Sequence, residues 1–210
     1  MTPSSTSVLG GLLLVVGLSG CSIWLEPGTP VATPPPIDFA DPVLNQRKIF
    51  VTGDITPESA ERIIRQLLFL DHQAVAPIEL NLMTPGGDLN AALALDRIMG
   101  RLRSPVNTRA LGECSSGGAL LLAAGTGTRE AFADSVIVLH GMEVNGKPPA
   151  RYTELTQDAY TAFWQQHAQL PPDWLPLPPG KMFVLSAPEA LRYRIIDQII
   201  PNSPTNRPPS

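Results

Sequence analysis

The stretch that decides the fold reads Gly112-Glu113-Cys114-Ser115-Ser116-Gly117-Gly118-Ala119. A β-like run at residues 106–111 precedes it and an apolar, helix-like run at residues 120–125 follows, which predicts a strand-to-helix turn. A serine in such a turn gains from the positive end of the helix dipole, and the amides after it can bind an oxyanion. From these residues alone two interpretations stay open: a nucleophile, or a packing motif that brings a helix close to a sheet.

The composition limits the classes of function. A chain of 210 residues that is 43% hydrophobic and 16% charged can bury one core, so we expect a single domain with tails. The net charge of −4 offers no electrostatic footprint for nucleic acid, and we expect no nucleic-acid partner. The pattern predicts neither a metal nor a cofactor. Of the two cysteines, Cys114 is expected to be a buried structural thiol.

The other cysteine closes a segment that resembles a bacterial lipoprotein signal peptide, residues 1–20. An apolar run covers residues 8–18, whereas a helix that spans a membrane needs about 20 residues. The run leads into Leu18-Ser19-Gly20-Cys21, where the expected cleavage site lies. The resemblance implies cleavage before Cys21 and attachment of lipid, palmitate included, to its sulfur. Ser22 implies sorting to the outer membrane, with the domain facing the periplasm. The alternative is a short N-terminal anchor with an incidental cysteine.

Proline-rich segments mark the expected boundaries of the domain. Residues 21–47 read as the lipidated cysteine and a Pro-rich linker that holds the domain off the membrane. Residues 48–200 form the expected domain, and residues 201–210 a Pro-rich disordered tail. A third proline cluster, at residues 171–179, predicts a loop inside the domain.

Between residues 49 and 140, predicted strands alternate with predicted helices. This alternation predicts βαβ units, and hence an α/β fold with a mostly parallel sheet. Sites in such sheets lie beyond the carboxyl ends of the strands. Three separate segments follow predicted strands, and we expect them to converge at one edge: residues 84–88, residues 113–118 and His140.

The order of these motifs resembles the Clp protease proteolytic subunit, ClpP, within the crotonase-like superfamily. The resemblance covers residues 48–200 and implies a ClpP-like α/β fold, a spiral core of repeated ββα and βαβ units, with serine peptidase activity. It rests on Ile49-Phe50-Val51-Thr52-Gly53, Gln66-Leu67-Leu68-Phe69-Leu70, Thr84-Pro85-Gly86-Gly87, residues 112–125, Val138-Leu139-His140, and Leu185-Ser186-Ala187-Pro188-Glu189-Ala190 with Ile196-Asp197.

By position, the resemblance implies that Ser116 is the nucleophile and His140 the general base. It also implies that the backbone amides of Gly87 and Gly117 form the oxyanion hole. This chemistry is coherent, because a serine hydroxyl needs an imidazole to take its proton and the tetrahedral intermediate needs donors already in place. Asp88, which lies beside the expected oxyanion hole, is predicted to cap the helix at residues 89–100 instead.

Two features depart from the family pattern. The family's triad aspartate falls on Pro178, and Asp173, in the Pro-rich loop, is the candidate for its role. Loss of the acid can lower turnover by ~10⁴. The segment from residue 141 to 179 is also shorter than in the family, so double rings are not expected, although a homo-oligomer stays open.

The leading hypothesis is a membrane-tethered, ATP-independent serine peptidase that acts on peptides or proteins of the cell envelope. The alternative is a catalytically impaired, ClpP-like pseudoenzyme that binds peptides or proteins in the periplasm, and Pro178 is the residue that supports it. A crotonase-type acyl-CoA enzyme is disfavoured, because no basic residues cluster near the motif to hold the CoA phosphates.

Overall fold

The computed structural model describes residues 36–143 and 146–202 of the chain. The expected signal peptide, Cys21 and residues 203–210 of the expected tail lie outside the described residues. Within those two ranges, no helix is both long and apolar enough to cross a membrane.

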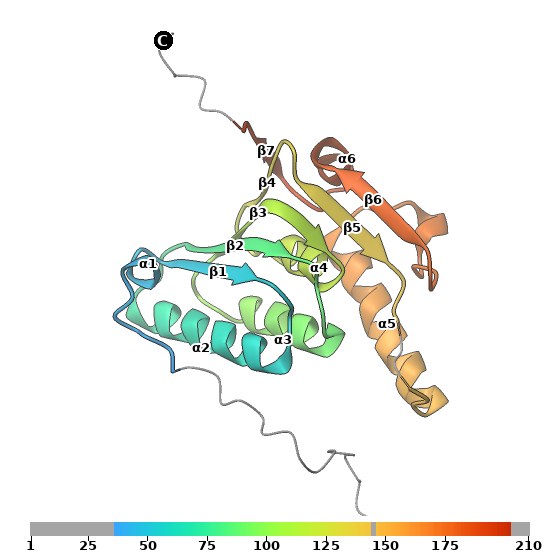
Figure 1. Cartoon of the computed structure of the whole chain (residues 1–210), viewed down its shortest axis with the longest axis horizontal. Coiled ribbons are helices and arrows are strands. Elements are labelled where there is room, and N and C mark those ends of the chain that lie inside the picture. Colours follow the sequence, from blue (N-terminus) through green and yellow to red (C-terminus); the bar gives the residue numbers. More distant parts are fainter. Residues whose placement is uncertain (1–35, 144–145, 203–210) are drawn as a thin grey trace, which may run out of the picture. The chain divides into compact units, whose positions relative to one another are not determined.

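Seven strands form one sheet in the order β1-β2-β3-β4-β7, with β5 paired to both β3 and β6 (Figure 1). The pairing of β5 with β6 is antiparallel and the other described pairings are parallel, which confirms the α/β fold with a mostly parallel sheet. The strands are β1 (Lys48–Thr52), β2 (Ile78–Thr84), β3 (Val106–Ser115), β4 (Arg129–Phe132), β5 (Val136–His140), β6 (Met182–Ser186) and β7 (Gln198–Ile200).

Two helices begin at the capping residues expected from the sequence. The Thr56 side chain accepts a hydrogen bond from the Ser59 amide at 3.2 Å, and the Asp88 carboxylate accepts one from the Ala91 amide at 2.7 Å. The helices are α1 (Pro42–Asn45), α2 (Pro57–Gln73), α3 (Leu89–Met99), α4 (Gly117–Ala123), α5 (Ala150–His167) and α6 (Ala187–Arg192), with a 3₁₀ turn, η1, at Pro172–Trp174.

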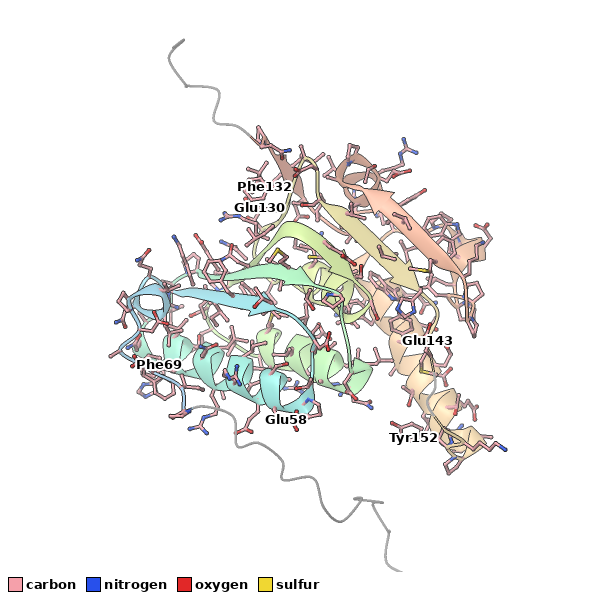
Figure 2. All side chains as sticks on the ribbon, viewed as in Figure 1. Glu58, Phe69, Glu130, Phe132, Glu143 and Tyr152 are labelled. Carbon is pink, nitrogen blue, oxygen red and sulfur yellow. The ribbon has the colours of Figure 1, made fainter. Side chains whose placement is uncertain are left out.

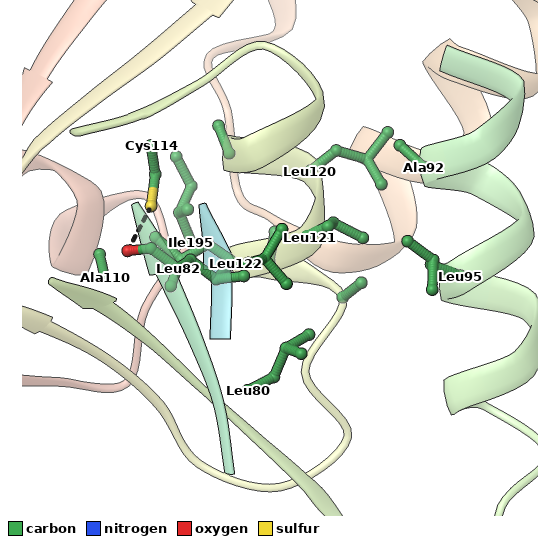
Figure 3. Packing of buried hydrophobic residues seen from close by; sticks show 14 of the residues in the cluster. Leu80, Leu82, Ala92, Leu95, Ala110, Cys114, Leu120, Leu121, Leu122 and Ile195 are labelled. Atoms are coloured by element: carbon green, nitrogen blue, oxygen red, sulfur yellow. Dashed lines mark hydrogen bonds between the residues drawn. The ribbon is translucent and has the colours of Figure 1, made fainter. Parts of the chain in front are cut away.

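The core is built around α4, all seven residues of which are buried. Figure 3 shows Leu120 of α4 facing Ala92 of α3, while Leu80 and Leu82 come from β2. Cys114 is fully buried beside them, and its thiol donates a long hydrogen bond, 3.7 Å, to the Leu82 carbonyl (Figure 3). Burial raises the pKa of this thiol to about 12, so Cys114 is a structural residue and not a nucleophile.

The packed unit starts ahead of the expected boundary at residue 48. Leu44 of α1 is only 2% exposed, and the Phe39 ring lies 4.5 Å, between centroids, from the Phe69 ring of α2. The proline content of this segment predicts a linker, but its apolar side chains cover the end of the core. The last part of the expected linker therefore belongs to the domain.

Candidate active site

Ser116 lies in the turn between β3, which ends at Ser115, and α4, which begins at Gly117. Its backbone has φ of 54° and ψ of −120°, a conformation rare for any residue but glycine. Such a conformation costs roughly 1–3 kcal/mol and persists only where its surroundings hold it. Here the Ser116 amide donates to the Val138 carbonyl of β5 at 2.8 Å. The turn thus presents a serine hydroxyl at the start of a buried helix.

The loop at Gly86 and Gly87 packs too closely against the serine turn and against Ile55 to hold any larger residue. A Cβ on Gly86 would lie 2.6 Å from the Ser116 Cβ. A Cβ on Gly87 would lie 2.2 Å from the Ile55 carbonyl oxygen, and the φ of Gly87 is +146°. Glycine at position 86 is therefore required to bring this loop against the serine turn, and glycine at position 87 is required to bring it against residue 55.

Two backbone amides are left to face a substrate. The Ile55 amide donates to the Gly86 carbonyl at 2.7 Å, and because the peptide is planar and trans, the Gly87 N–H points the opposite way, away from Ile55. Gly117 is the first residue of α4, so its N–H has no acceptor within the helix. Among the described residues, neither amide has a hydrogen-bond partner. The two donors can therefore hold an oxyanion.

His140 ends β5, the strand that pairs with the end of β3. Its Nδ1 lies 2.7 Å from the Gly141 carbonyl oxygen. Since a carbonyl only accepts, Nδ1 carries the proton, and the neutral imidazole keeps Nε2 as a proton acceptor. Within the described ranges no hydrogen bond joins His140 to Ser116, but both line one cleft.

The cleft has a volume of about 760 Å³ and is walled by the glycine loop, the serine turn and α5. Figure 2 shows Glu143 on the segment that leads towards α5 and Tyr152 near the start of that helix; both line the cleft. The carboxylates of Asp54, Asp88 and Glu143 contribute to it, whereas no lysine or arginine of the described chain does. A cleft of this charge does not suit CoA phosphates.

The structure brings together Ser116, His140, Gly87 and Gly117, but it does not bring Asp173 to them. Asp173 lies exposed in η1 and is absent from the lining of the cleft. In its place the Gly141 carbonyl accepts the proton of His140 Nδ1. Sequence patterns could not reveal this partner, since a backbone acceptor has no residue-type signature. No described group of three or more His, Cys, Asp or Glu side chains could hold a metal ion.

Comparisons with known proteins show what the chain as a whole is similar to. The family model described as Clp protease matches residues 36–203. The ATP-dependent Clp protease proteolytic subunit of Deinococcus radiodurans is 32% identical to this chain over 183 residues, a match that covers 81% of this chain and 88% of that relative. The matched region begins at residue 36, close to where packing onto the core begins.

Proposed function

This chain belongs to the Clp protease family, and from that premise we propose that it is a membrane-tethered, ATP-independent serine peptidase that acts on peptides or proteins of the cell envelope. The observation that carries the catalytic part is the convergence of Ser116, His140 and two unused amides on one cleft. The family shows the kind of enzyme; the Ser-His chemistry, the tether and the envelope substrates are our proposal.

In the first step, Ser116 Oγ attacks a peptide carbonyl carbon while His140 Nε2 takes the hydroxyl proton. The carbonyl oxygen becomes an oxyanion, held by the Gly87 and Gly117 amides. The C–N bond then breaks, His140 gives its proton to the leaving amine, and an acyl-serine remains. Water, deprotonated by the same imidazole, attacks the acyl carbon and releases the acid product and the free serine.

The Gly141 carbonyl performs part of the role of a triad acid, which is to orient the histidine and to stabilise its protonated form. Its contact with Nδ1 selects the tautomer in which Nε2 is free to take a proton. It carries no full negative charge, so it stabilises the imidazolium less than a carboxylate does. We therefore expect a slow but real peptidase.

A fluorophosphonate probe tests the nucleophile directly. The full chain, purified in detergent, should be labelled, and the Ser116→Ala variant should not. A Ser115→Ala variant is the matched control, because Ser115 adjoins the nucleophile but its hydroxyl donates to the Glu113 carboxylate at 2.6 Å. Labelling that survives in Ser116→Ala, or is absent from the wild type, would sink the proposed chemistry.

The second candidate is a pseudoenzyme that binds peptides in the same cleft without cleaving them. The observation that favours it is the proline at position 178, where the family resemblance places the acid. This reading predicts that a fluorescent casein peptide binds the wild type and Ser116→Ala equally, with no cleavage product after prolonged incubation. Cleavage by the wild type alone decides for the peptidase.

The tether is tested through the two cysteines. In a Gram-negative host fed labelled palmitate, the wild type should incorporate the label and fractionate with the outer membrane. Cys21→Ser should lose both properties, whereas Cys114→Ser, which removes the buried thiol, should retain the label. Palmitate in the Cys21→Ser protein would rule out the lipoprotein reading.

A further inference from the structure

A buried tyrosine of α5 contacts the backbone of the histidine. The Tyr160 hydroxyl donates to the His140 carbonyl at 2.9 Å. Tyr160 is 5% exposed, and its ring packs edge-on against Trp164 at 6.1 Å between centroids. Burial raises the pKa of the phenol to about 12, so the hydroxyl keeps its proton and remains a donor at any ordinary assay pH.

The backbone that follows His140 is confined from the other side as well. Gly141 is buried, and a Cβ placed on it would lie 2.3 Å from the Pro178 carbonyl oxygen and 2.6 Å from that of Leu177. Leu177 is itself 1% exposed. The 140–141 peptide is thus held between the Tyr160 hydroxyl and the 177–178 segment.

This confinement bears on the imidazole, because the Gly141 carbonyl is the group that accepts the proton of His140 Nδ1. A planar peptide moves as a unit, so a hydrogen bond to the His140 carbonyl also restrains the start of Gly141. The Gly141 carbonyl belongs to the next peptide unit, which is attached at the Gly141 Cα. If the Tyr160 bond is lost, a rotation of the 140–141 peptide changes the position and direction of that attachment, and this displaces the Gly141 carbonyl that orients the imidazole.

Resting on the peptidase activity proposed above, we propose that Tyr160 is a positioning residue, which fixes the orientation of the His140 imidazole through the main chain of residues 140 and 141. It does not touch the reacting atoms. It performs, together with the Gly141 carbonyl, the orienting role for which the sequence offers no carboxylate at position 178.

The test removes the hydroxyl alone. In Tyr160→Phe the ring still packs on Trp164, and we expect the rate of Ser116 acylation by a fluorophosphonate to fall about tenfold, the effect of losing one ordinary hydrogen bond. Peptide binding is measured in variants that cannot cleave the peptide. The Kd of a fluorescein-labelled casein peptide for the Ser116→Ala/Tyr160→Phe double variant should lie within about twofold of its Kd for Ser116→Ala. Tyr193→Phe is the control, since Tyr193 does not line the cleft.

Each outcome of this experiment supports or overturns the role of Tyr160. An unchanged acylation rate in Tyr160→Phe overturns the inference while leaving the peptidase intact. A loss of peptide affinity as large as the loss of acylation overturns it too, because Tyr160 would then only shape the cleft wall. A wild type that is never acylated removes the proposed function, and the inference falls with it.

Discussion

Gly87 is the residue at which the oxyanion donor can be tested most sharply. A Cβ there would lie 2.2 Å from the Ile55 carbonyl oxygen and 2.8 Å from the Ile55 amide nitrogen, so alanine must displace the loop and its N–H. Removing one oxyanion donor costs roughly 10²–10³ in turnover. We expect Gly87→Ala to lose at least that much in peptide hydrolysis and in the rate of fluorophosphonate labelling.

Gly53→Ala provides the matched control for this loss. Gly53 also has a positive φ, +74°, but nothing lies within 4 Å of the place where its Cβ would stand. The Gly53→Ala variant should keep most of the wild-type activity and lose only some stability, because alanine strains the backbone at this φ. Equal activity in the two alanine variants would mean that the Gly87 amide is not a donor.

Pro178 is the residue at which the missing acid can be restored. Its carbonyl lies against Gly141, the residue that orients His140, and the family resemblance places the triad aspartate at this position. A carboxylate near the imidazole favours the imidazolium that forms in the transition state. We expect Pro178→Asp to raise kcat roughly tenfold and to move the acid limb of the pH–rate profile to higher pH.

Pro179→Asp adds the same charge one residue further along, at an exposed position. It should leave both kcat and the pH profile unchanged. If both aspartate variants behave alike, the effect is one of general charge, and position 178 is not equivalent to the acid of the family.

The convergence of the candidate site residues on one cleft could be predicted from motifs, and the backbone partner of His140 could not. Ser116, His140 and the two glycines stand in short motifs at strand ends, and Asp88 follows the ordinary rule for a helix cap. The Gly141 carbonyl is available in any residue, so nothing in the sequence marks it. In the sequence, Tyr160 is only one of the apolar positions of a predicted helix.

At the scale of elements, alternation and capping predicted most of the first part of the chain. Prediction was weaker where tertiary packing decides. The strand β3 runs on to Ser115, because its last residues pair with β5. The sequence does not predict the strands β6 and β7, because they are short and their neighbours in the sheet come from distant parts of the chain.

The contact between Arg129 and Asp197 ties β4 to β7 and should make stability depend on pH. The Asp197 carboxylate accepts from the Arg129 backbone amide at 2.9 Å and from its guanidinium at 2.6 and 3.0 Å. The hydrogen bonds from Arg129 lower the pKa of Asp197. This stabilisation is therefore present above the pKa of an unfolded aspartate, about 3.9, and is lost as pH falls through the lower pKa of the folded state.

We expect Asp197→Asn to lower the Tm of the full chain by a few degrees at pH 7, with the difference from wild type shrinking in acid. The effect is modest because the side chain of Asp197 is 42% exposed. Asp134→Asn, at an exposed turn, is the control and should not change Tm at either pH. A Tm deficit for Asp197→Asn that stays constant down to pH 3 would contradict the linkage.

At the scale of the whole molecule, the β5–β6 pair offers a surface for self-association. Among the described strands, β6 pairs with β5 alone and so forms an edge of the sheet. Because residue pairs alternate across an antiparallel ladder, Val136, Val184 and Met182 lie on one face, and they are 42%, 61% and 64% exposed. Exposed apolar side chains that gather on one face mark a surface where another chain binds. We therefore expect the chain to form a homo-oligomer through this face.

Val184→Glu should break this association, since a charge at the centre of an apolar face must be desolvated when the face is covered. The mass of the full chain in detergent, measured by light scattering after gel filtration and corrected for bound detergent, should fall from a multiple of the monomer to the monomer. Val75→Glu introduces the same charge at a valine that is 60% exposed but lies in the loop after α2, and it should leave the mass unchanged. If the wild type is already monomeric at micromolar concentration, or if both variants dissociate alike, this face is not the interface.

Retention of Ser116 labelling in monomeric Val184→Glu would further show that the site of one chain is complete, because Ser116, His140 and both oxyanion amides come from the same subunit.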